Sequence, residues 1–415
     1  MRSIKESRLR SNTYVALGLI PLSGFAMDVY IPSLPDMAVQ LHTTPAAIQL
    51  TLSLFIISYG ISQLIVGGLL DSYGRFGLNL VGMLVFSAAS FTIAFTKNIE
   101  VIYAMRIVQG FAVALIVVGK RSFFVDMYSG EELKKFTSLF SVIWAIGPIV
   151  APFLGGFFQT TWGWKSNFIF LGFFSLIFFV IELFIGGESL KKKQPFSVRV
   201  ILNSYGSMVK KVDFTAGMAI LGFAYAMILL YGMASPFLIE QRLHLSPHVT
   251  GYCALFSGVS VMIGGSLSRM LIQKPFVKKL LIASGIQVTM VALLITTTFY
   301  YQSMVTLLLY VFLLHSTAGF IFNNLMSYCL VRFPEYAGKA AGLVGGGFSV
   351  VTSIMSSVLV NSITITNQTV LGAGYAVLIV GMLLLIVKTK WKGSEESKQP
   401  GEKHHWQQPA AMMVE

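Results

Sequence analysis

The segment IPSLPDMAVQLHTTP, Ile31–Pro45, has a counterpart in the second half of the chain, ASPFLIEQRLHLSP, Ala234–Pro247. When the two are aligned, a proline near the start of each matches, and so do two Leu-His pairs, at His42 and His244. Each segment closes on Thr-Pro or Ser-Pro, which is typical of a helix N-cap followed by proline at the first helical position. The shared pattern predicts a duplicated unit with a helix boundary at the same point of each copy.

Long apolar stretches lie on both sides of these segments. A helix needs about 20 apolar residues to cross the hydrocarbon layer, and the sequence offers twelve such spans, near residues 12–32, 46–70, 77–96, 99–126, 136–158, 166–186, 213–239, 247–272, 277–299, 302–331, 337–361 and 368–387. We therefore expect an all-α integral membrane protein with twelve transmembrane helices in two six-helix bundles.

The longest internal connection divides these spans six and six. It is basic and places apolar residues at helical spacing, which predicts an interfacial helix. The expected organisation is an amino-terminal bundle over 1–186, a basic cytoplasmic linker over 187–212, a carboxy-terminal bundle over 213–390, and a polar, disordered tail over 391–415.

Composition supports a membrane protein and excludes other classes. Of the 415 residues, 55% are hydrophobic and only 11% are charged, which does not suit a soluble core. The net charge of +13 does not indicate nucleic-acid binding, because Lys and Arg lie in short connections between apolar stretches. Most of them fall on one side, so the positive-inside rule places both termini in the cytoplasm. The two cysteines lie in apolar stretches, where we expect packing and neither a disulfide nor a metal site.

Asp28 is a lone charge near the far end of the first stretch. By helix rise it lies roughly 24 Å into the span. Burying a carboxylate costs about 2.5–3.5 kcal/mol on insertion scales, so we expect Asp28 to face the protein interior and to hold a proton or pair with a cation. A carboxylate at the outer interface is the alternative, since Pro32 and Pro35 indicate a helix end close by.

The fourth stretch carries polar residues on one face. Arg106, Gln109, Val113 and Lys120 follow the spacing of three and four residues that places side chains on the same side of a helix. Arg106 lies at the level of Asp28, and we expect a charge pair or a proton relay between them. Gln109, Val113 and Lys120 are predicted to line a substrate cavity, although Lys120 could instead reach lipid phosphates.

Four further residues are candidates for the same cavity: Tyr30, Tyr231, His315 and Asn323. For His315 and Asn323, in the unusually polar tenth stretch, an interhelical hydrogen bond is the alternative.

Five motifs resemble those of one transporter family. GGLLDSYGR, Gly67–Arg75, resembles the loop motif of the major facilitator superfamily; RIVQG, Arg106–Gly110, resembles its fourth-helix motif; GPIVAPFLGG, Gly147–Gly156, resembles its fifth-helix antiporter motif. Together with MDVYIPSLP, Met27–Pro35, and WGWKSNFIF, Trp162–Phe170, they resemble the drug:proton antiporters of the Bcr/CflA type, named for bicyclomycin and chloramphenicol resistance.

This resemblance extends over residues 12–390 and implies a two-bundle transporter of the bacterial inner membrane. We expect a monomer, because such a transporter completes its own pathway. Such a transporter alternates access around a central cavity and exports a small molecule in exchange for protons, with no cofactor besides the proton gradient. Asp28 then corresponds to the proton-binding acid and Arg106 to the fourth-helix arginine. The proton affinity of such a carboxylate must change as the cavity opens to one side or the other.

The resemblance also assigns two structural motifs. A cytoplasmic latch is implied for Gly67, Asp71, Gly74, Arg75 and Asp126, and the antiporter motif is supplied by Gly147, Pro148, Pro152, Gly155 and Gly156. Phe76 stands where a second basic residue usually follows Arg75, so we expect a weaker latch.

The cargo is less defined by the sequence. With Lys120 in the cavity, charge balance favours a neutral or anionic molecule such as a metabolite or siderophore; with Lys120 outside it, generic amphiphilic drugs remain. A proton symporter that imports a nutrient is an alternative function. A membrane-embedded enzyme is a remote one, because the outer loops are short and no cluster with metal-ligand spacing occurs in the sequence.

Overall fold

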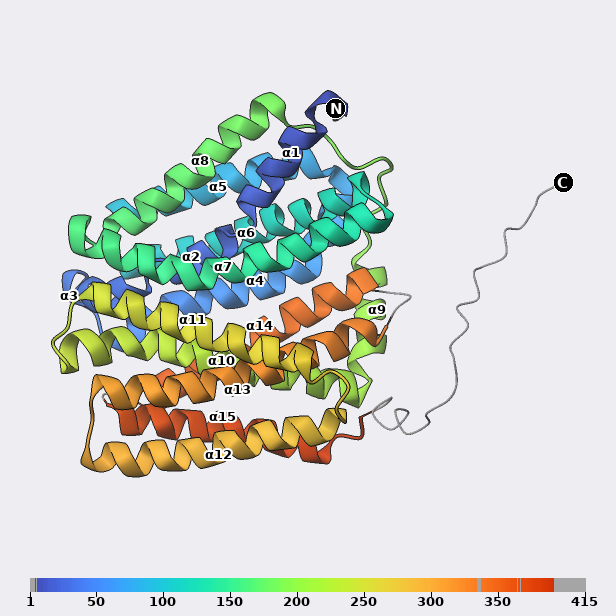
Figure 1. Cartoon of the computed structure of the whole chain (residues 1–415). Helices are drawn as coiled ribbons and strands as arrows, with labels where there is room; N and C mark the ends of the chain where they lie inside the picture. Colours follow the sequence, from blue (N-terminus) through green and yellow to red (C-terminus); the bar gives the residue numbers. More distant parts are fainter. Residues whose placement is uncertain (1–3, 5, 334–336, 364, 366, 392–415) are drawn as a thin grey trace.

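The computed structural model describes residues 4, 6–333, 337–363, 365 and 367–391, and within these ranges every regular element is a helix (Figure 1). The first half comprises α1 (Glu6–Leu19), α2 (Leu22–Asp28), η1 (Ile31–Ser33), α3 (Leu34–Gln40), α4 (Pro45–Tyr73), α5 (Arg75–Phe95), α6 (Ile99–Met127), α7 (Gly130–Trp162) and α8 (Lys165–Ile185). The second half comprises α9 (Val198–Val209), α10 (Val212–Pro236), η2 (Phe237–Arg242), α11 (Pro247–Met270), α12 (Phe276–Tyr300), α13 (Met304–Val331), α14 (Ala337–Ser362) and α15 (Gln368–Lys388).

The predicted membrane fold is confirmed. Eleven helical stretches of the described chain are long and apolar enough to span a membrane by length and composition. The predicted span at 136–158 corresponds to α7, which is 33 residues long and contains side chains outside the described set. Most of the predicted tail, 391–415, also lies outside the described residues; Trp391, its first residue, is buried and donates to the Ile386 carbonyl at 3.2 Å.

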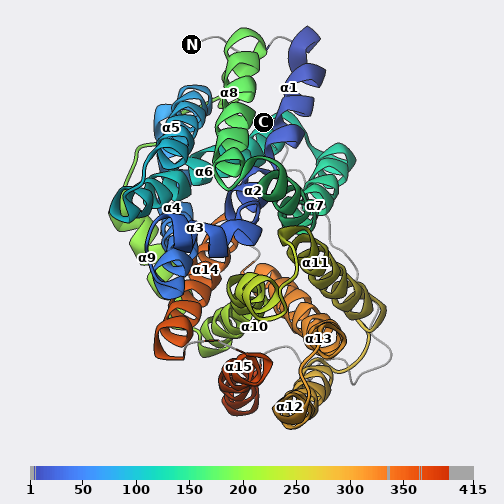
Figure 2. The ribbon, with the colours of Figure 1, turned by 90° about the vertical axis from the view of Figure 1, so that its left-hand side faces the viewer.

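The helices pack as two bundles, α1–α8 and α10–α15. In the first, α4 and α5 pack against α6, α5 against α8, and α2 against α7; in the second, α11 packs against α13, α10 against α14, and α12 against α15. The bundles meet where α4 packs against α14 and α7 against α11, as Figure 2 shows from one end. We call the end of the molecule where α9 lies the linker end and the end where α3 and η2 lie the far end (Figure 1).

The predicted repeat appears in the backbone at the far end. Among the described non-glycine residues, only His42 and His244 have positive φ, at 50° and 55°. Each follows a helix end and precedes an extended N-cap, Thr44 with ψ 155° and Ser246 with ψ 157°. Few residues other than glycine adopt this left-handed backbone conformation. Two histidines that adopt it at matching positions show that both halves turn the same corner.

The first span differs from the prediction. Instead of one continuous helix over 12–32, the chain breaks after Leu19, forms α2, and breaks again after Asp28 before α3 extends the span to Gln40. Pro21 has no backbone N–H and cannot continue the hydrogen-bond ladder of α1, so a new helix starts beyond it. The second break leaves carbonyl groups at the end of α2 available to other partners.

Candidate functional site

Arg106 is the polar centre of the first bundle. It comes from the amino-terminal third of α6 and is fully buried. Its Nη1 donates to the carbonyl of Ala26 and to Oε1 of Gln109, both at 2.8 Å, and its Nε donates to the carbonyl of Thr51 at 3.3 Å. Ala26 is near the carboxyl end of α2, where the break exposes carbonyls and the helix dipole favours a cation. Through these hydrogen bonds, Arg106 connects α6 to α2 of the first span and to α4.

Two aromatic rings flank this guanidinium. The central carbon of the Arg106 guanidinium lies 4.7 Å from the ring centroid of Tyr30 and 4.3 Å from that of Phe55, within the range of cation–π attraction. Tyr30 is itself fixed by Thr51, its hydroxyl 2.8 Å from Oγ1, and by the ring of Phe168. Tyr30, predicted to line a cavity, therefore lies against Arg106 in the bundle interior.

Asp28 occupies the last position of α2, where the first span breaks. Its side chain is buried, with 6% exposure, and Oδ2 has no hydrogen-bond partner among the described residues. Arg106 keeps one free donor as well, because its Nη2 finds no partner in the same part of the chain. The charge of Arg106 acts on Asp28, but no ion pair joins these two described side chains. Asp28 and Arg106 therefore do not form the expected ion pair, and Oδ2 of the one and Nη2 of the other remain without a hydrogen-bond partner among the described residues.

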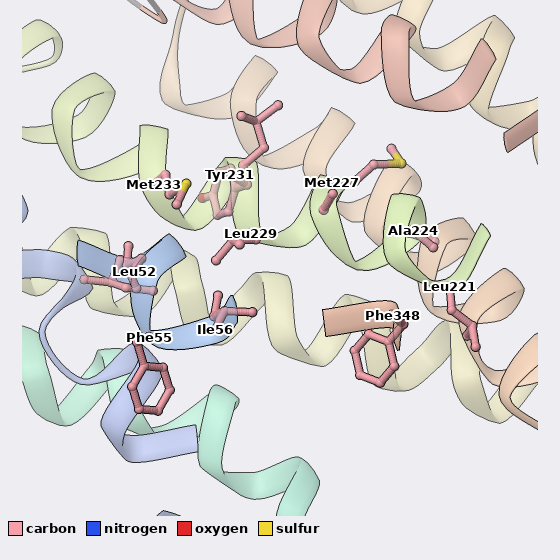
Figure 3. Packing of buried hydrophobic residues seen from close by; sticks show 14 of the residues in the cluster. Leu52, Phe55, Ile56, Leu221, Ala224, Met227, Leu229, Tyr231, Met233 and Phe348 are labelled. Carbon is pink, nitrogen blue, oxygen red and sulfur yellow. The ribbon is translucent and has the colours of Figure 1, made fainter. Parts of the chain in front are cut away.

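Residues near Asp28 bring the two bundles together. The Tyr225 hydroxyl of α10 lies 3.9 Å from Sδ of Met27, the neighbour of Asp28, and the Nε2 of Gln49 donates to the Met233 carbonyl at 2.7 Å. Figure 3 shows apolar side chains of α4 facing α10 across the same interface. Asp28 therefore lies where a relative movement of the bundles changes its surroundings.

The second bundle contributes a hydrogen-bonded histidine. Nδ1 of His315 lies 2.7 Å from the Ser257 hydroxyl, and Nε2 lies 3.1 Å from the Tyr375 hydroxyl. The Tyr231 ring packs edge-on against His315, at 5.3 Å between centroids, and its buried hydroxyl has no partner within the described ranges. Asn323 lies apart, donating to the Gly265 carbonyl at 2.8 Å. His315 and Asn323 thus both make interhelical hydrogen bonds.

Lys120 forms an ion pair inside the first bundle. Its Nζ lies 2.7 Å from Oε1 of Glu182 in α8, and both side chains are buried. Gln109, toward the middle of α6, extends the Arg106 network by donating to Ser90 at 2.7 Å, and Val113 is fully buried. The polar residues of α6 are therefore engaged mainly within the bundle.

The loop motif forms a charged cluster at the linker end. Arg75 lies between Asp71, at 3.1 Å, and Asp126, with which it forms a close ion pair. Gly74 turns the chain from α4 into α5 with φ 105°, a conformation that suits glycine. Gly67 is not crowded, since a Cβ placed on it would meet no described atom within 4 Å.

The fifth-helix motif lets α7 pack closely against two partners. A Cβ on Gly155 would lie 1.5 Å from the Val29 carbonyl oxygen, so the first span touches α7 backbone to backbone. On the other side, a Cβ on Gly156 would lie 2.7 Å from the carbonyl of Pro247 in α11. Gly147 and Pro152 also lie at backbone contacts with these partners, whereas the side chain of Pro148 is outside the described residues. Small residues thus place α7 between the first span and the second bundle.

Residues 17–356 match the sequence profile of the Major Facilitator Superfamily. The chain belongs to this superfamily. It is 27% identical to multidrug resistance protein D of Escherichia coli, with 89% of this chain and 92% of that protein covered. It is 25% identical to a bicyclomycin resistance protein homolog of Haemophilus influenzae, covering 83% and 88% respectively.

Solved structures agree on the fold of this superfamily member. The D-xylose–proton symporter matches with a TM-score of 0.69 at 15% identity, over 94% of this chain and 98% of that one. The chain is accordingly a multi-pass secondary transporter and not an enzyme, and its resemblance to drug-resistance proteins is confirmed.

Sequence reasoning on this facilitator missed three acids that the structure places in polar clusters. Glu182 pairs with Lys120, Glu188 contacts the loop motif, and Asp213 accepts from Arg332 at 2.7 Å. A signal was available for Glu182, because a lone acid in an otherwise apolar stretch calls for a buried cation.

Proposed function

We propose that the protein exports a small amphiphilic molecule in exchange for protons, with Asp28 as the proton-binding group and Arg106 as its electrostatic partner. The observation that carries this proposal is the buried Oδ2 of Asp28, which lacks a partner among the described residues although Arg106 Nη2 is also unpaired nearby. A charged group at membrane depth is costly unless it is paired or protonated. A change in the distance to Arg106, or in the access of water, would therefore load or release a proton.

The bundles supply the movement in this proposal. The bundles, over 1–186 and 213–390, would rock about the 187–212 linker, and the Arg75 cluster would serve as a latch at the linker end. That end carries the excess of basic residues, so we place it, with both termini, at the cytoplasmic side of the bacterial inner membrane. Each chain contains two complete bundles, which supports a monomer.

Export is favoured by the relatives, two of which are named for multidrug and bicyclomycin resistance. The cargo we propose is neutral or zwitterionic and drug-like. Preference for an anionic cargo such as a siderophore depended on a free Lys120 in the cavity, and the 2.7 Å contact with Glu182 removes that support. Asp28 and Arg106 then leave the site balanced, with one acid and one base.

Transport in everted membrane vesicles tests this function. Chloramphenicol or bicyclomycin added to energised vesicles should release protons, measured with a pH-sensitive dye, and Asp28→Asn should abolish that release. Asp36→Asn is the matched control, because Asp36 lies eight residues further on and is hydrogen-bonded by Gln40 and Gln159 at 3.0 Å. Unchanged proton release in Asp28→Asn would refute the assignment.

A nutrient symporter is the second candidate, since the superfamily fold also serves a sugar–proton symporter. Transport driven by a proton gradient separates the two. In everted vesicles with an acidic interior, the outward flow of protons drives drug uptake by an exporter, whereas a symporter loses its cargo together with the protons.

A further inference from the structure

The first residues of the linker contact the loop motif through Glu188. One carboxylate oxygen accepts from the backbone N–H of Arg75 at 3.0 Å, and the other accepts from that of Phe76 at 3.2 Å. These N–H groups start α5 and have no partner within the helix. A negative charge at a helix N-terminus is also favourable. Glu188 thus caps α5 from a segment more than a hundred residues away in sequence.

Two later residues of the linker add contacts to the same cluster. The Ser189 hydroxyl donates to Oδ2 of Asp126 at 2.8 Å, and the backbone N–H of Gln194 donates to the Asp71 carbonyl at 2.9 Å. The same acids, Asp71 and Asp126, hold the guanidinium of Arg75. The linker therefore fixes the backbone of Arg75 and both of its acidic partners.

Beyond Gln194 the linker crosses to the second bundle. Helix α9 lies over the linker ends of both bundles (Figure 1) and contacts α4, α10 and α14. The Tyr205 hydroxyl donates to the Leu64 carbonyl of α4 at 3.1 Å, and Nζ of Lys339 in α14 donates to the Ser204 hydroxyl at 2.9 Å. Burial raises the pKa of Tyr205, so its hydroxyl keeps this proton. A displacement of α14 thus acts on the linker.

We propose that Glu188 is a positioning residue of the linker-end gate, through which the linker holds the Arg75 cluster closed until the second bundle moves. This inference rests on the proposed alternating-access function. Glu188 also accepts from the backbone N–H of Phe76, an uncharged residue, so α5 is anchored without a basic side chain at that position. When α9 is drawn away with α14, Glu188 and Ser189 leave α5 and Asp126, and Arg75 is freed together with them.

Distance measurements between the bundles test this role without any cargo. Spin labels go on Tyr14→Cys in α1 and Met270→Cys in α11, both exposed in different bundles, in a chain with Cys253→Ala and Cys329→Ala. Removing a capping side chain changes an equilibrium about 2- to 30-fold. Glu188→Gln and Glu188→Ala should shift the ratio of open to closed distances by that factor, and Glu188→Asp should restore part of it.

Glu132→Gln is the matched control, because Glu132 is an exposed acid in the first turn of α7 at the same end. It should leave the distances unchanged. If Glu188→Gln fails to fold, Ser189→Ala, which removes only the contact with Asp126, should give a smaller shift in the same direction. Wild-type distributions in the folded Glu188 and Ser189 variants would overturn the proposal. Loss of proton coupling in Asp28→Asn is scored separately, so either proposal can fail alone.

Discussion

Gly155→Ala should damage both the stability and the transport of this protein. A Cβ at this position would lie 1.5 Å from the Val29 carbonyl oxygen and 2.6 Å from its carbonyl carbon, whereas ordinary contact begins near 3.4 Å. The first span must therefore move by about 2 Å relative to α7. Overpacking of a tight interface costs about 1–3 kcal/mol, and here the obstacle is backbone, which cannot rotate away. At about 2–4 °C per kcal/mol for units of bundle size, the melting temperature should fall by about 2–12 °C.

The assay is thermal unfolding of detergent-purified protein, followed by tryptophan fluorescence, together with proton release in everted vesicles. Gly285→Ala in α12 is the control, because a Cβ there meets no described atom within 4 Å. Val29 directly follows Asp28, so Gly155→Ala should also impair proton release in the fraction that remains folded. A Gly155→Ala protein that melts and transports like Gly285→Ala would refute the close packing of the first span against α7.

Three other predictions follow from the contacts described above. Arg106→Lys should abolish drug-driven proton release, because an ammonium cannot reproduce the donors to Ala26 and Gln109 together with the stacking between two rings; normal release in vesicles would contradict this. Glu182→Gln should lower the free energy of unfolding by about 3–5 kcal/mol, because it leaves Lys120 buried without its charged partner. The double variant Lys120→Met with Glu182→Leu should recover most of that loss. Melting temperatures of the single and double variants test this prediction. His244→Gly should be neutral or stabilise by up to about 1 kcal/mol because its φ is 55°, and His244→Val should destabilise; equal melting temperatures for the two variants would count against the left-handed corner.

Periodic features of this chain could be predicted from its sequence. Spans follow from apolar length, and the repeat followed from matching prolines and histidines at the two corners. The breaks within the first span were harder to foresee, because Pro21 lies inside an apolar run whose hydropathy does not change there. The break also packs against α7, where a Cβ placed on Gly147 would lie 3.3 Å from the Pro21 carbonyl oxygen and 3.3 Å from Cα of Gly24.

Contacts between distant charges were the least predictable part of the site. Arg106 could be assigned to the level of Asp28 from helix rise, but its hydrogen bond to the Ala26 carbonyl depends on the end of α2 at Asp28, which comes before the helix end that Pro32 and Pro35 indicated. Similarly, Lys120 has two possible directions on an isolated helix, and only the neighbouring α8 presents Glu182 to it. Helical spacing predicts the helix face on which a side chain lies, whereas the residue that the side chain contacts depends on how the helices are arranged.

The left-handed histidines at the far end also constrain how the molecule can change shape. A residue with φ near 50° has little freedom to rotate, so His42 and His244 make poor pivots. Each corner should move as a rigid body together with the helices on both sides of it. Bending during a transport cycle is then left to the interrupted first span and to the segments around α9, which makes the two membrane faces mechanically unequal.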